Sequence, residues 1–190
     1  MAKRALIVVD VQNDFIPGGA LGVPEGDQVI EPINKLIDEF VARGVLVIYT
    51  KDYHPSNHIS FKVNHPKGIW PPHCVQNSAG VEFHPALKVK GQTFYKAFTP
   101  EQHSYSGFGG RREPQLEAQS LEAYLKEQGV EEVVVVGLAL DYCVKSTAID
   151  AQNLGFKSTV LLEGTRAVNV QPEDAAKAIE EMKERGIVVQ

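Results

Sequence analysis

The stretch Glu132–Asp150, EVVVVGLALDYCVKSTAID, constrains the fold more than any other part of the chain. It begins with a run of valines, 133–136, without polar alternation, as expected for a strand that is buried on both faces of a sheet. Gly137 is predicted to end this strand. From Tyr142 onward, apolar residues recur at spacings of three and four, which indicates a helix. The sequence therefore predicts a buried strand, then a turn that carries Cys143, then a helix.

A cysteine at such a turn has two interpretations. The unpaired N–H groups and the positive end of a helix dipole favour the thiolate, which is the nucleophilic form. A lone cysteine can equally be a small apolar residue of the core, and position alone gives the two interpretations equal weight for Cys143. Cys74 follows Pro71-Pro72-His73 in an irregular stretch. We predict a structural role for Cys74, with a place beside a metal ion as the alternative.

Glycines mark a repeating pattern along the chain. Gly44, Gly129, Gly155 and Gly186 each follow a predicted helix and precede an apolar run. Glycine suits the left-handed conformation that often follows a helix. Helices alternating with strands predict an α/β fold: three layers, α/β/α, around a mostly parallel central sheet of about six strands with right-handed crossovers.

The predicted elements follow from these patterns. Strands are expected at 5–9, 45–49, 92–95, 133–136, 157–162 and 187–189, and helices at 28–42, 120–128, 142 onward and 172–185, the last with Pro172 in first position. Residues 50–100 read as mainly irregular. An irregular region this long within a compact domain is usually functional.

Composition excludes several classes of protein. The 190 residues are 43% hydrophobic, which suits a single domain over 1–190. A net charge of −5 without a basic block argues against nucleic acid and anionic membranes as partners. The apolar run 5–9 is cut short by Asp10, so no secretory signal is expected, and no run is long enough to span a bilayer. Two cysteines are too few for a disulfide framework, which favours a cytoplasmic location.

Polar residues follow several of the predicted strands. In parallel sheets, ligands bind outside the carboxyl ends of the strands. Asp10, Asp52 and Lys96 follow the first, second and third strands, and Cys143 lies just beyond the fourth. Asp10 is a candidate base and Lys96 a candidate stabiliser of a thiolate and an oxyanion. The alternatives are a turn-forming aspartate and a solvated surface lysine.

Histidines crowd into one part of the irregular region. Five of the six, all but His103, lie between residues 54 and 84. Asp52 and His54 fall on the same side of an extended segment, with His58 close by and His73 on a separate turn. Aspartate and histidine ligands suit Zn²⁺, Fe²⁺ or Mn²⁺. The alternative is a polar, solvated loop, to which we assign the remaining three histidines: His65, His84 and His103.

Three aromatic residues, Phe15, Trp70 and Tyr105, lie in or beside the predicted loops rather than on periodic core faces. A flat ring would stack between such side chains. Ordinary packing beneath loops is the alternative, and it has nearly equal weight for Tyr105. The sequence thus predicts a pocket for a small aromatic molecule beside the polar cluster.

Together these features resemble the nicotinamidase (pyrazinamidase) branch of the isochorismatase-like cysteine hydrolases. The resemblance runs nearly end to end. The matching parts are ALIVVDVQNDFIPGGAL (5–21), KDYHPSNHISF (51–61), WPPHCVQ (70–76), Lys96, YSGF (105–108) and GLALDYCVKSTAIDA (137–151).

The resemblance implies roles for individual residues. The family's catalytic triad maps onto Asp10, Lys96 and Cys143. Its metal ligands map onto Asp52, His54 and His73, with His58 as a further candidate, and its substrate-binding positions map onto Phe15, Trp70, Tyr105 and Leu138. The backbone N–H groups of Ala139 and Cys143 correspond to the oxyanion hole, with a cis peptide expected between Leu138 and Ala139.

The resemblance also implies an activity. It predicts hydrolysis of nicotinamide and pyrazinamide to the carboxylate and ammonia through a cysteine thioester, with a divalent metal ion, foremost Zn²⁺, orienting the ring, as a step of NAD salvage. The segment 109–119 is longer than in compact relatives, and we interpret it as a rim or a contact surface. The oligomeric state stays open, with a homo-oligomer as one alternative.

Other functions fit the sequence less well. A metal-free amidase acting on carbamoyl groups lacks the Asp52, His54 and His73 set, and an isochorismatase lacks the nucleophilic cysteine. A non-catalytic metal-binding or scaffold domain would have Cys143 buried and inert. A redox protein is disfavoured because the chain has no C-x-x-C motif.

Overall fold

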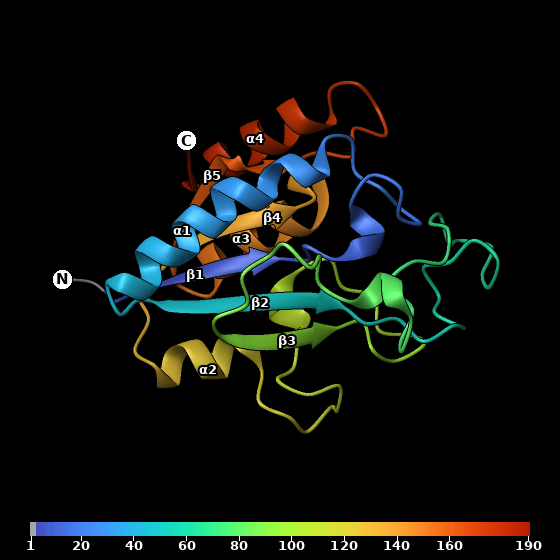
Figure 1. Cartoon of the computed structure of the whole chain (residues 1–190), viewed down its shortest axis with the longest axis horizontal. Helices are drawn as coiled ribbons and strands as arrows, with labels where there is room; N and C mark the ends of the chain where they lie inside the picture. Colours follow the sequence, from blue (N-terminus) through green and yellow to red (C-terminus); the bar gives the residue numbers. More distant parts are fainter. Residues whose placement is uncertain (1–2) are drawn as a thin grey trace.

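A computed structural model describes residues 3–190 and contains a six-stranded sheet in the order β3-β2-β1-β4-β5-β6, in which every neighbouring pair is parallel (Figure 1). The predicted α/β class with a central parallel sheet is confirmed. The strands are β1 Arg4–Val9, β2 Leu46–Asp52, β3 Gln92–Lys96, β4 Glu132–Leu138, β5 Lys157–Arg166 and β6 Val188–Val189.

Helices cover both faces of the sheet. They are α1 Ile30–Ala42, α2 Leu121–Glu127, α3 Lys145–Asn153 and α4 Asp174–Glu184. The buried side of α1 packs on one face, whereas α2, α3 and α4 contribute to the core on the other (Figure 1). Among residues 3–190, no helix is long and apolar enough to cross a membrane.

Both faces of strand β1 are buried, which explains why its sequence does not alternate between polar and apolar residues. Ala5, Ile7 and Val9 point into the core beside α2, α3 and α4, while Leu6 and Val8 point into the core beside α1. All five are fully buried. Each large aliphatic side chain buried in this way contributes roughly 1.5–3 kcal/mol, so both faces of the strand hold the layers together.

The glycines that end the helices have the predicted conformation. Gly44, Gly129, Gly155 and Gly186 have φ angles of +67°, +68°, +92° and +79°. An L side chain is strained in this region, whereas glycine is not. The chain therefore leaves each helix and turns directly into the next strand.

Gly137 does not end its strand, contrary to the prediction. It has φ +117°, and β4 continues through it to Leu138. A Cβ atom at this position would lie 2.0 Å from the carbonyl oxygen of Val9, its partner on β1. Glycine thus allows the two central strands to stay paired up to their carboxyl ends.

Other boundaries differ by smaller amounts. β2 continues to Asp52 and β5 to Arg166, beyond the predicted 49 and 162, because polar residues at their carboxyl ends are also buried or paired. The last helix begins at Asp174, after Pro172 rather than on it. Proline restricts the residue before it and lacks an N–H, so the turn that contains it precedes the helix here.

The long segment 109–119 lies against the outer edge of the sheet. Arg111 forms an antiparallel bridge with Tyr95 of β3, with N–O distances of 2.7 and 2.9 Å. The Ser120 side chain then accepts a hydrogen bond from Ala123 N at the start of α2. Covering an edge strand in this way removes unpaired backbone groups that would otherwise be exposed.

Candidate active site

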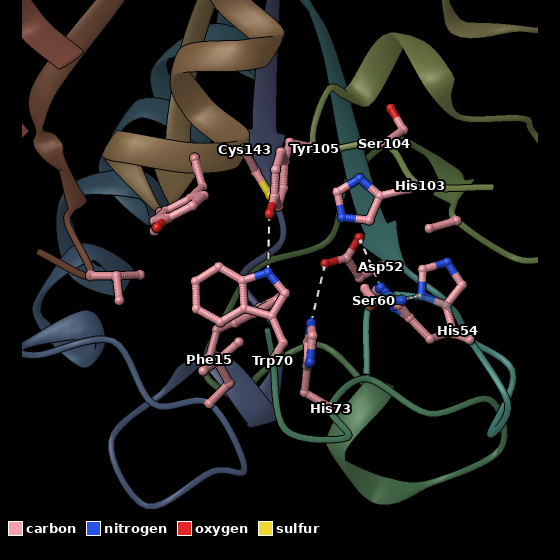
Figure 2. Close-up of a pocket in the computed structure, with 16 residues that line it drawn as sticks. Phe15, Asp52, His54, Ser60, Trp70, His73, His103, Ser104, Tyr105 and Cys143 are labelled. Carbon is pink, nitrogen blue, oxygen red and sulfur yellow. Dashed lines mark hydrogen bonds and ion pairs between the residues drawn. The ribbon is translucent and has the colours of Figure 1, made fainter. Parts of the chain in front are cut away.

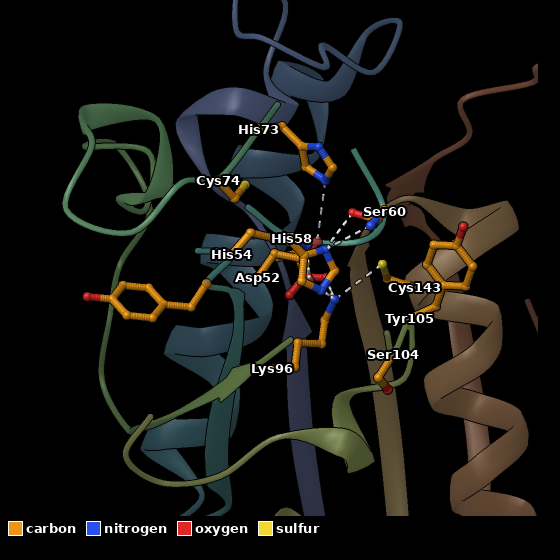
Figure 3. A network of polar contacts seen from close by, with 12 residues as sticks. Asp52, His54, His58, Ser60, His73, Cys74, Lys96, Ser104, Tyr105 and Cys143 are labelled. Atoms are coloured by element: carbon orange, nitrogen blue, oxygen red, sulfur yellow. Dashed lines mark hydrogen bonds and ion pairs between the residues drawn. The ribbon is translucent and has the colours of Figure 1, made fainter. Parts of the chain in front are cut away.

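The strands β1, β2, β3 and β4 carry four polar residues to one end of the sheet. Asp10 directly follows β1, Asp52 and Lys96 end β2 and β3, and Cys143 lies in the turn after β4. Figure 3 shows the Lys96 ammonium between the Asp52 carboxylate and the Cys143 sulfur. The structure therefore brings together the residues that the strand-end rule selected from the sequence.

Lys96 is the centre of this cluster. Its Nζ lies 2.9 Å from Asp10 Oδ2 and 3.5 Å from Cys143 Sγ, and it also forms an ion pair with Asp52 Oδ1. Burial acts to lower the pKa of Lys96, but Asp10, Asp52 and Cys143 together outweigh it and raise this pKa well above the usual value. The buried side chain is therefore a charged ammonium, compensated by two carboxylates.

Asp10 is fully buried and sits in strained backbone, with φ +49°. Strain of this kind persists where the surrounding structure fixes it, often at functional sites. Thr50 Oγ1 donates a 2.7 Å hydrogen bond to Asp10 Oδ1, which leaves Oδ2 facing Lys96. Burial raises the pKa of Asp10 to about 6, against the lowering effect of Lys96. A carboxylate with this pKa is suited to accept a proton near neutral pH.

Cys143 lies in a π-helical turn, Leu140–Val144, that precedes α3. Its Sγ lies within 4.8 Å of the carboxylates of Asp10 and Asp52. Burial raises the pKa of the Cys143 thiol well above the usual value, and Lys96 only partly offsets this. The expectation that a helix terminus would favour the resting thiolate is therefore wrong, because the sulfur is too deeply desolvated. The thiol needs a base, and Asp10 is within reach.

The Cys143 turn is fastened to a neighbouring loop by Thr147. Its Oγ1 donates to the Cys143 carbonyl oxygen at 2.7 Å and accepts from Gly107 N at 2.9 Å. A side chain on Gly107 would collide with Thr50 at 2.8 Å. Sequence reasoning missed Thr147, because a threonine within a helix carries no sign of a loop contact.

Asp52, His54 and His73 form a compact ligand set, with one candidate atom from each within 4.8 Å of the others. His54 Nε2 lies 3.9 Å from Asp52 Oδ1, and His73 Nε2 lies 4.0 Å from Asp52 Oδ2. His73 Nδ1 is 2.8 Å from the carbonyl oxygen of Pro71, which assigns the proton to Nδ1 and leaves the Nε2 lone pair available.

The chemistry of these residues fits a divalent metal ion. Burial lowers the pKa of His54 to about 3 and also lowers the pKa of His73, so both rings are neutral, as metal ligands must be. Within residues 3–190, the buried His54 Nδ1 has no hydrogen-bond partner. A buried ring nitrogen without a partner is costly in an apoprotein, and a bound cation nearby would use the neutral ring.

His58 is placed differently from the other candidate ligands. Its ring lies 4.3 Å from that of His54, but Nδ1 is 2.7 Å from Ser60 Oγ and Nε2 is 2.9 Å from the Gln102 carbonyl oxygen. Both ring nitrogens are therefore engaged. His58 packs against the ligand set and would have to give up a hydrogen bond to join it.

Asp10, Asp52 and Cys143 also lie close enough together to suggest a second ion site. The Lys96 ammonium lies among them, in contact with all three. A cation is thus already supplied by the protein, and a metal ion there would face a buried positive charge. We interpret this cluster as an ammonium-centred network.

A pocket opens beside both clusters (Figure 2). Cys143 lies on one side of it and the Asp52, His54 and His73 set on another. The residues that line it are Phe15, Leu21, Asp52, His54, His58, Ser60, Trp70, His73, Ala97, His103, Ser104, Tyr105, Ala139, Tyr142, Cys143 and Val168. One cavity therefore gives access to the sulfur and to the ligand set at once.

The aromatic wall includes Phe15, Trp70 and Tyr105, as the sequence suggested, and also Tyr142. Trp70 Nε1 donates a 3.0 Å hydrogen bond to Tyr105 Oη, visible in Figure 2. The Trp70 ring meets Tyr142 edge to face at 5.0 Å. A wall of locked rings of this kind favours a flat aromatic ligand.

Some predictions about the pocket need correction. The Leu138 side chain is fully buried in the core beside α1 and is not among the lining residues, so the structure does not bring it to the cavity. His103 lies on an exposed loop, as assigned, and also lines the cavity. Leu21 and Val168 were missed because loop positions have no periodicity that marks the direction of a side chain, and Tyr142 because it lies in a π-helical turn that the α-helical spacing does not describe.

The turn after β4 also contains the expected cis peptide, between Leu138 and Ala139. Ala139 and Cys143 both line the pocket; Ala139 directly precedes the π-helical turn and Cys143 lies within it.

A parallel α/β/α fold with a buried carboxylate, ammonium and thiol at the carboxyl ends of its strands defines a class of cysteine-dependent hydrolases. The chain belongs to the isochorismatase family: the model of the Isochorismatase domain matches residues 4–190.

Known relatives agree over nearly the whole chain. A nicotinamidase of Escherichia coli K12 is 45% identical over 203 residues, covering 98% of this chain and 93% of its own. A solved pyrazinamidase of Pyrococcus horikoshii in complex with zinc has a TM-score of 0.87 and 43% identity, covering 99% and 98% of the two chains. The yeast nicotinamidase Pnc1p bound to the inhibitor nicotinaldehyde has a TM-score of 0.85 and 35% identity, covering 98% of each.

Proposed function

We propose that the protein is an amidohydrolase that converts nicotinamide, and also pyrazinamide, to the carboxylate and ammonia. The observation that carries the proposal is the Asp10, Lys96 and Cys143 cluster, which lies beside an aromatic-walled pocket that also reaches Asp52, His54 and His73. The substrates are those of relatives whose names are nicotinamidase and pyrazinamidase.

In the first half-reaction, Asp10 Oδ2 takes the proton of the Cys143 thiol. Lys96 Nζ, 3.5 Å from the sulfur, stabilises the thiolate as it forms. The thiolate attacks the carboxamide carbon, and the oxygen that gains negative charge faces the backbone N–H groups of Ala139 and Cys143. The C–N bond then breaks, the proton held by Asp10 passes to the leaving nitrogen, and ammonia departs.

In the second half-reaction, a water molecule attacks the thioester carbon. Asp10, again a carboxylate, accepts one proton from this water, so it acts as base in both halves. The C–S bond breaks and the Cys143 sulfur recovers a proton, which restores the resting thiol. The sum is amide plus water to carboxylic acid plus ammonia, with the enzyme unchanged.

Asp52, His54 and His73 are proposed to hold one divalent ion, with Zn²⁺ as the first choice and Fe²⁺ or Mn²⁺ as alternatives. The zinc complex of the relative from Pyrococcus horikoshii supports this choice. The bound ion would supply a fixed positive charge that orients the ring nitrogen of the substrate. Phe15 and Trp70 would hold the faces of the same ring.

We further propose that the reaction takes place in the cytoplasm as a step of NAD salvage. Cys74 and Cys143 are both free thiols, as expected for a reducing compartment. Hydrolysis releases a pyridine carboxylate, which is a form in which the ring can be used again.

The test is ammonia release from nicotinamide before and after removal of bound metal, with benzamide as a matched substrate that lacks the ring nitrogen. We expect rapid release from nicotinamide that falls at least about tenfold on chelation and returns with added Zn²⁺. Benzamide should be a poor substrate whose rate changes little. Equal rates for the two amides, before and after chelation, would contradict the ring-orienting role and favour a metal-free amidase.

A further inference from the structure

One carboxylate joins the loop that carries Phe15 to the loop that carries His73. Asp14 Oδ2 accepts a 2.7 Å hydrogen bond from Cys74 N, and Oδ1 accepts a 3.2 Å hydrogen bond from Ala20 N. In sequence, Asp14 immediately precedes Phe15, and Cys74 immediately follows His73. The hydrogen bond to Cys74 N therefore joins the backbone beside a ring-stacking residue to the backbone beside a candidate metal ligand.

Cys74 is held in an unusual conformation at this contact. Its φ is +46°, a region in which a side chain other than that of glycine is strained. A charge-assisted hydrogen bond to its N–H offsets part of that cost. The geometry of the His73 turn thus depends on an acceptor that comes from another loop.

A third segment packs against the same carboxylate. A Cβ atom on Gly80 would lie 2.1 Å from Asp14 Oδ2 and 2.3 Å from Oδ1, so only a hydrogen fits there. Next to it, Asn13 Nδ2 donates a 2.8 Å hydrogen bond to the Ala79 carbonyl oxygen. Asp14 is therefore enclosed by loops on several sides and is not a side chain that can swing away freely.

The neighbouring Gln12 makes a similar connection to the other end of the ligand set. Gln12 Nε2 donates to the Asp52 carbonyl oxygen at 2.8 Å, and Gln12 Oε1 accepts from Asp52 N at 2.9 Å. The short segment 12–15 thus contacts the backbone of Asp52 and the backbone beside His73. It ends in Phe15, whose ring lies 5.5 Å from that of His73.

We propose that Asp14 is a positioning residue that fixes His73 and Phe15 relative to each other, so that one carboxylate sets both the metal affinity and the substrate affinity. Asp14 does not line the pocket formed by the described residues, so it acts only through the two loops. The substrate half of this proposal rests on the proposed function, whereas the metal half does not.

The test uses Asp14→Ala, Asp14→Asn and Gly80→Ala. Asp14→Asn keeps the size of the side chain but replaces one acceptor with a donor. Gly80→Ala keeps the carboxylate but forces it away from its present place, and Gly80 has no left-handed φ that would penalise alanine. Asn34→Ala is the matched control, because Asn34 also joins two segments through hydrogen bonds to Ala86 and Lys88, away from the pocket.

The main readout is the Kd for Zn²⁺ alone, measured by titrating metal-free protein in competition with a chromophoric chelator. Loss of a side chain that supports a metal ligand typically weakens metal binding by about 10–100-fold. We expect this effect in Asp14→Ala and Gly80→Ala, a smaller one in Asp14→Asn, and none in Asn34→Ala.

The second readout separates positioning from a merely structural role. At saturating Zn²⁺ and with the nicotinamide concentration varied, KM should rise in Asp14→Ala and Gly80→Ala, while kcat changes by less than about threefold. Lower Tm values with unchanged Kd for Zn²⁺ in folded Asp14→Asn and Gly80→Ala would overturn the proposal. A weaker Kd for Zn²⁺ without any nicotinamide turnover in the parent protein would support the metal half and refute the proposed function instead.

Discussion

The two cysteines are similarly buried, but the groups around their sulfur atoms differ. Cys74 and Cys143 are both buried and both free, and burial raises the pKa of each thiol well above its usual value. Cys143 has the Lys96 ammonium at 3.5 Å and borders the pocket, whereas Cys74 is not among the pocket-lining residues of the described chain. Around Cys74 the carboxylates of Asp52, Asp10 and Asp14 raise the thiol pKa further.

The comparison shows that desolvation does not distinguish a nucleophile from a structural thiol. What differs is direct contact and access: the Lys96 ammonium lies within hydrogen-bonding distance of the Cys143 sulfur, and of the two cysteines only Cys143 lines the pocket. A thiol that is protonated at rest can still react when a base takes its proton in contact with the substrate. The reactivity of a sulfur in this protein therefore depends on the polar groups that the strand ends place around it. Burial in the core alone does not make a sulfur reactive.

The largest effect should come from removing the sulfur of Cys143. Cys143→Ala is expected to lower kcat for ammonia release from nicotinamide by roughly 10³-fold or more, because the covalent route is lost. The fold, measured by circular dichroism, and the bound metal, measured by elemental analysis, should be unchanged, since Asp52, His54 and His73 remain.

Cys74→Ala is the matched control for this change. It removes one buried heavy atom, so the free energy of unfolding should fall by about 1 kcal/mol while kcat stays within about threefold. The comparison between the two sulfurs would fail if Cys74→Ala and Cys143→Ala impaired turnover to the same extent.

The next effect concerns the cation. Lys96→Gln leaves the buried Asp10 and Asp52 carboxylates without their shared partner, which should cost about 3 kcal/mol of stability and about 10²-fold in kcat. Because Lys96 lowers the pKa of Cys143, its loss should also slow alkylation of that thiol by iodoacetamide at a fixed pH.

Lys145→Gln tests whether any lysine near the sulfur would serve. Lys145 is close to Cys143 in sequence but pairs with Glu181 at 2.9 Å. Alkylation rate and kcat should stay within about twofold of the parent values, because surface pairs of this kind contribute little. A parallel loss in both lysine variants would mean that general destabilisation, and not the buried ammonium, explains the result for Lys96→Gln.

The smallest effect is a displacement of the pH profile. The pKa of Asp10 is raised to about 6, so the carboxylate becomes protonated as pH falls through this value and can no longer accept a proton. We expect kcat/KM to fall about tenfold per pH unit on the acid side. A cation held by Asp52 opposes the charge that raises this pKa, so the limb of the metal-loaded enzyme should lie at or below about 6.

Thr50→Val sharpens this prediction. The hydrogen bond from Thr50 lowers the pKa of Asp10, so its loss should move the acid limb to higher pH. Thr159→Val, a change of the same shape on β5, should leave the profile in place. If Thr50→Val leaves the acid limb at the same pH, a group other than Asp10 controls the rate.

The sequence predicted the parts of the fold that depend on periodicity and on glycine. Gly44 and Gly129 have the expected left-handed backbone, and unbroken apolar runs such as 133–136 are strands buried on both faces. The rule that ligands bind at the carboxyl ends of parallel strands was enough to predict that Asp10 and Cys143 lie close together.

The residues that line the pocket were harder to predict from the sequence. His103 lines the cavity because of the path of an irregular loop, and Tyr142 because the helix after β4 begins with a π-helical turn; no spacing pattern in the sequence records either. Leu138 was expected at the pocket and lies in the core, since its strand continues past Gly137 and keeps its alternation of faces. The thiol pKa was also misjudged, because desolvation depends on packing that a local motif does not contain.

The missing side chain at Gly137 has a consequence beyond its own strand. Its partner on β1, Val9, is the residue before Asp10, and Gly137 lies upstream of the Cys143 turn. A single methyl group there would overlap the Val9 backbone and force β1 and β4 apart, one residue before Asp10 and six before Cys143. The alignment of base and nucleophile therefore depends on a backbone contact that only glycine permits.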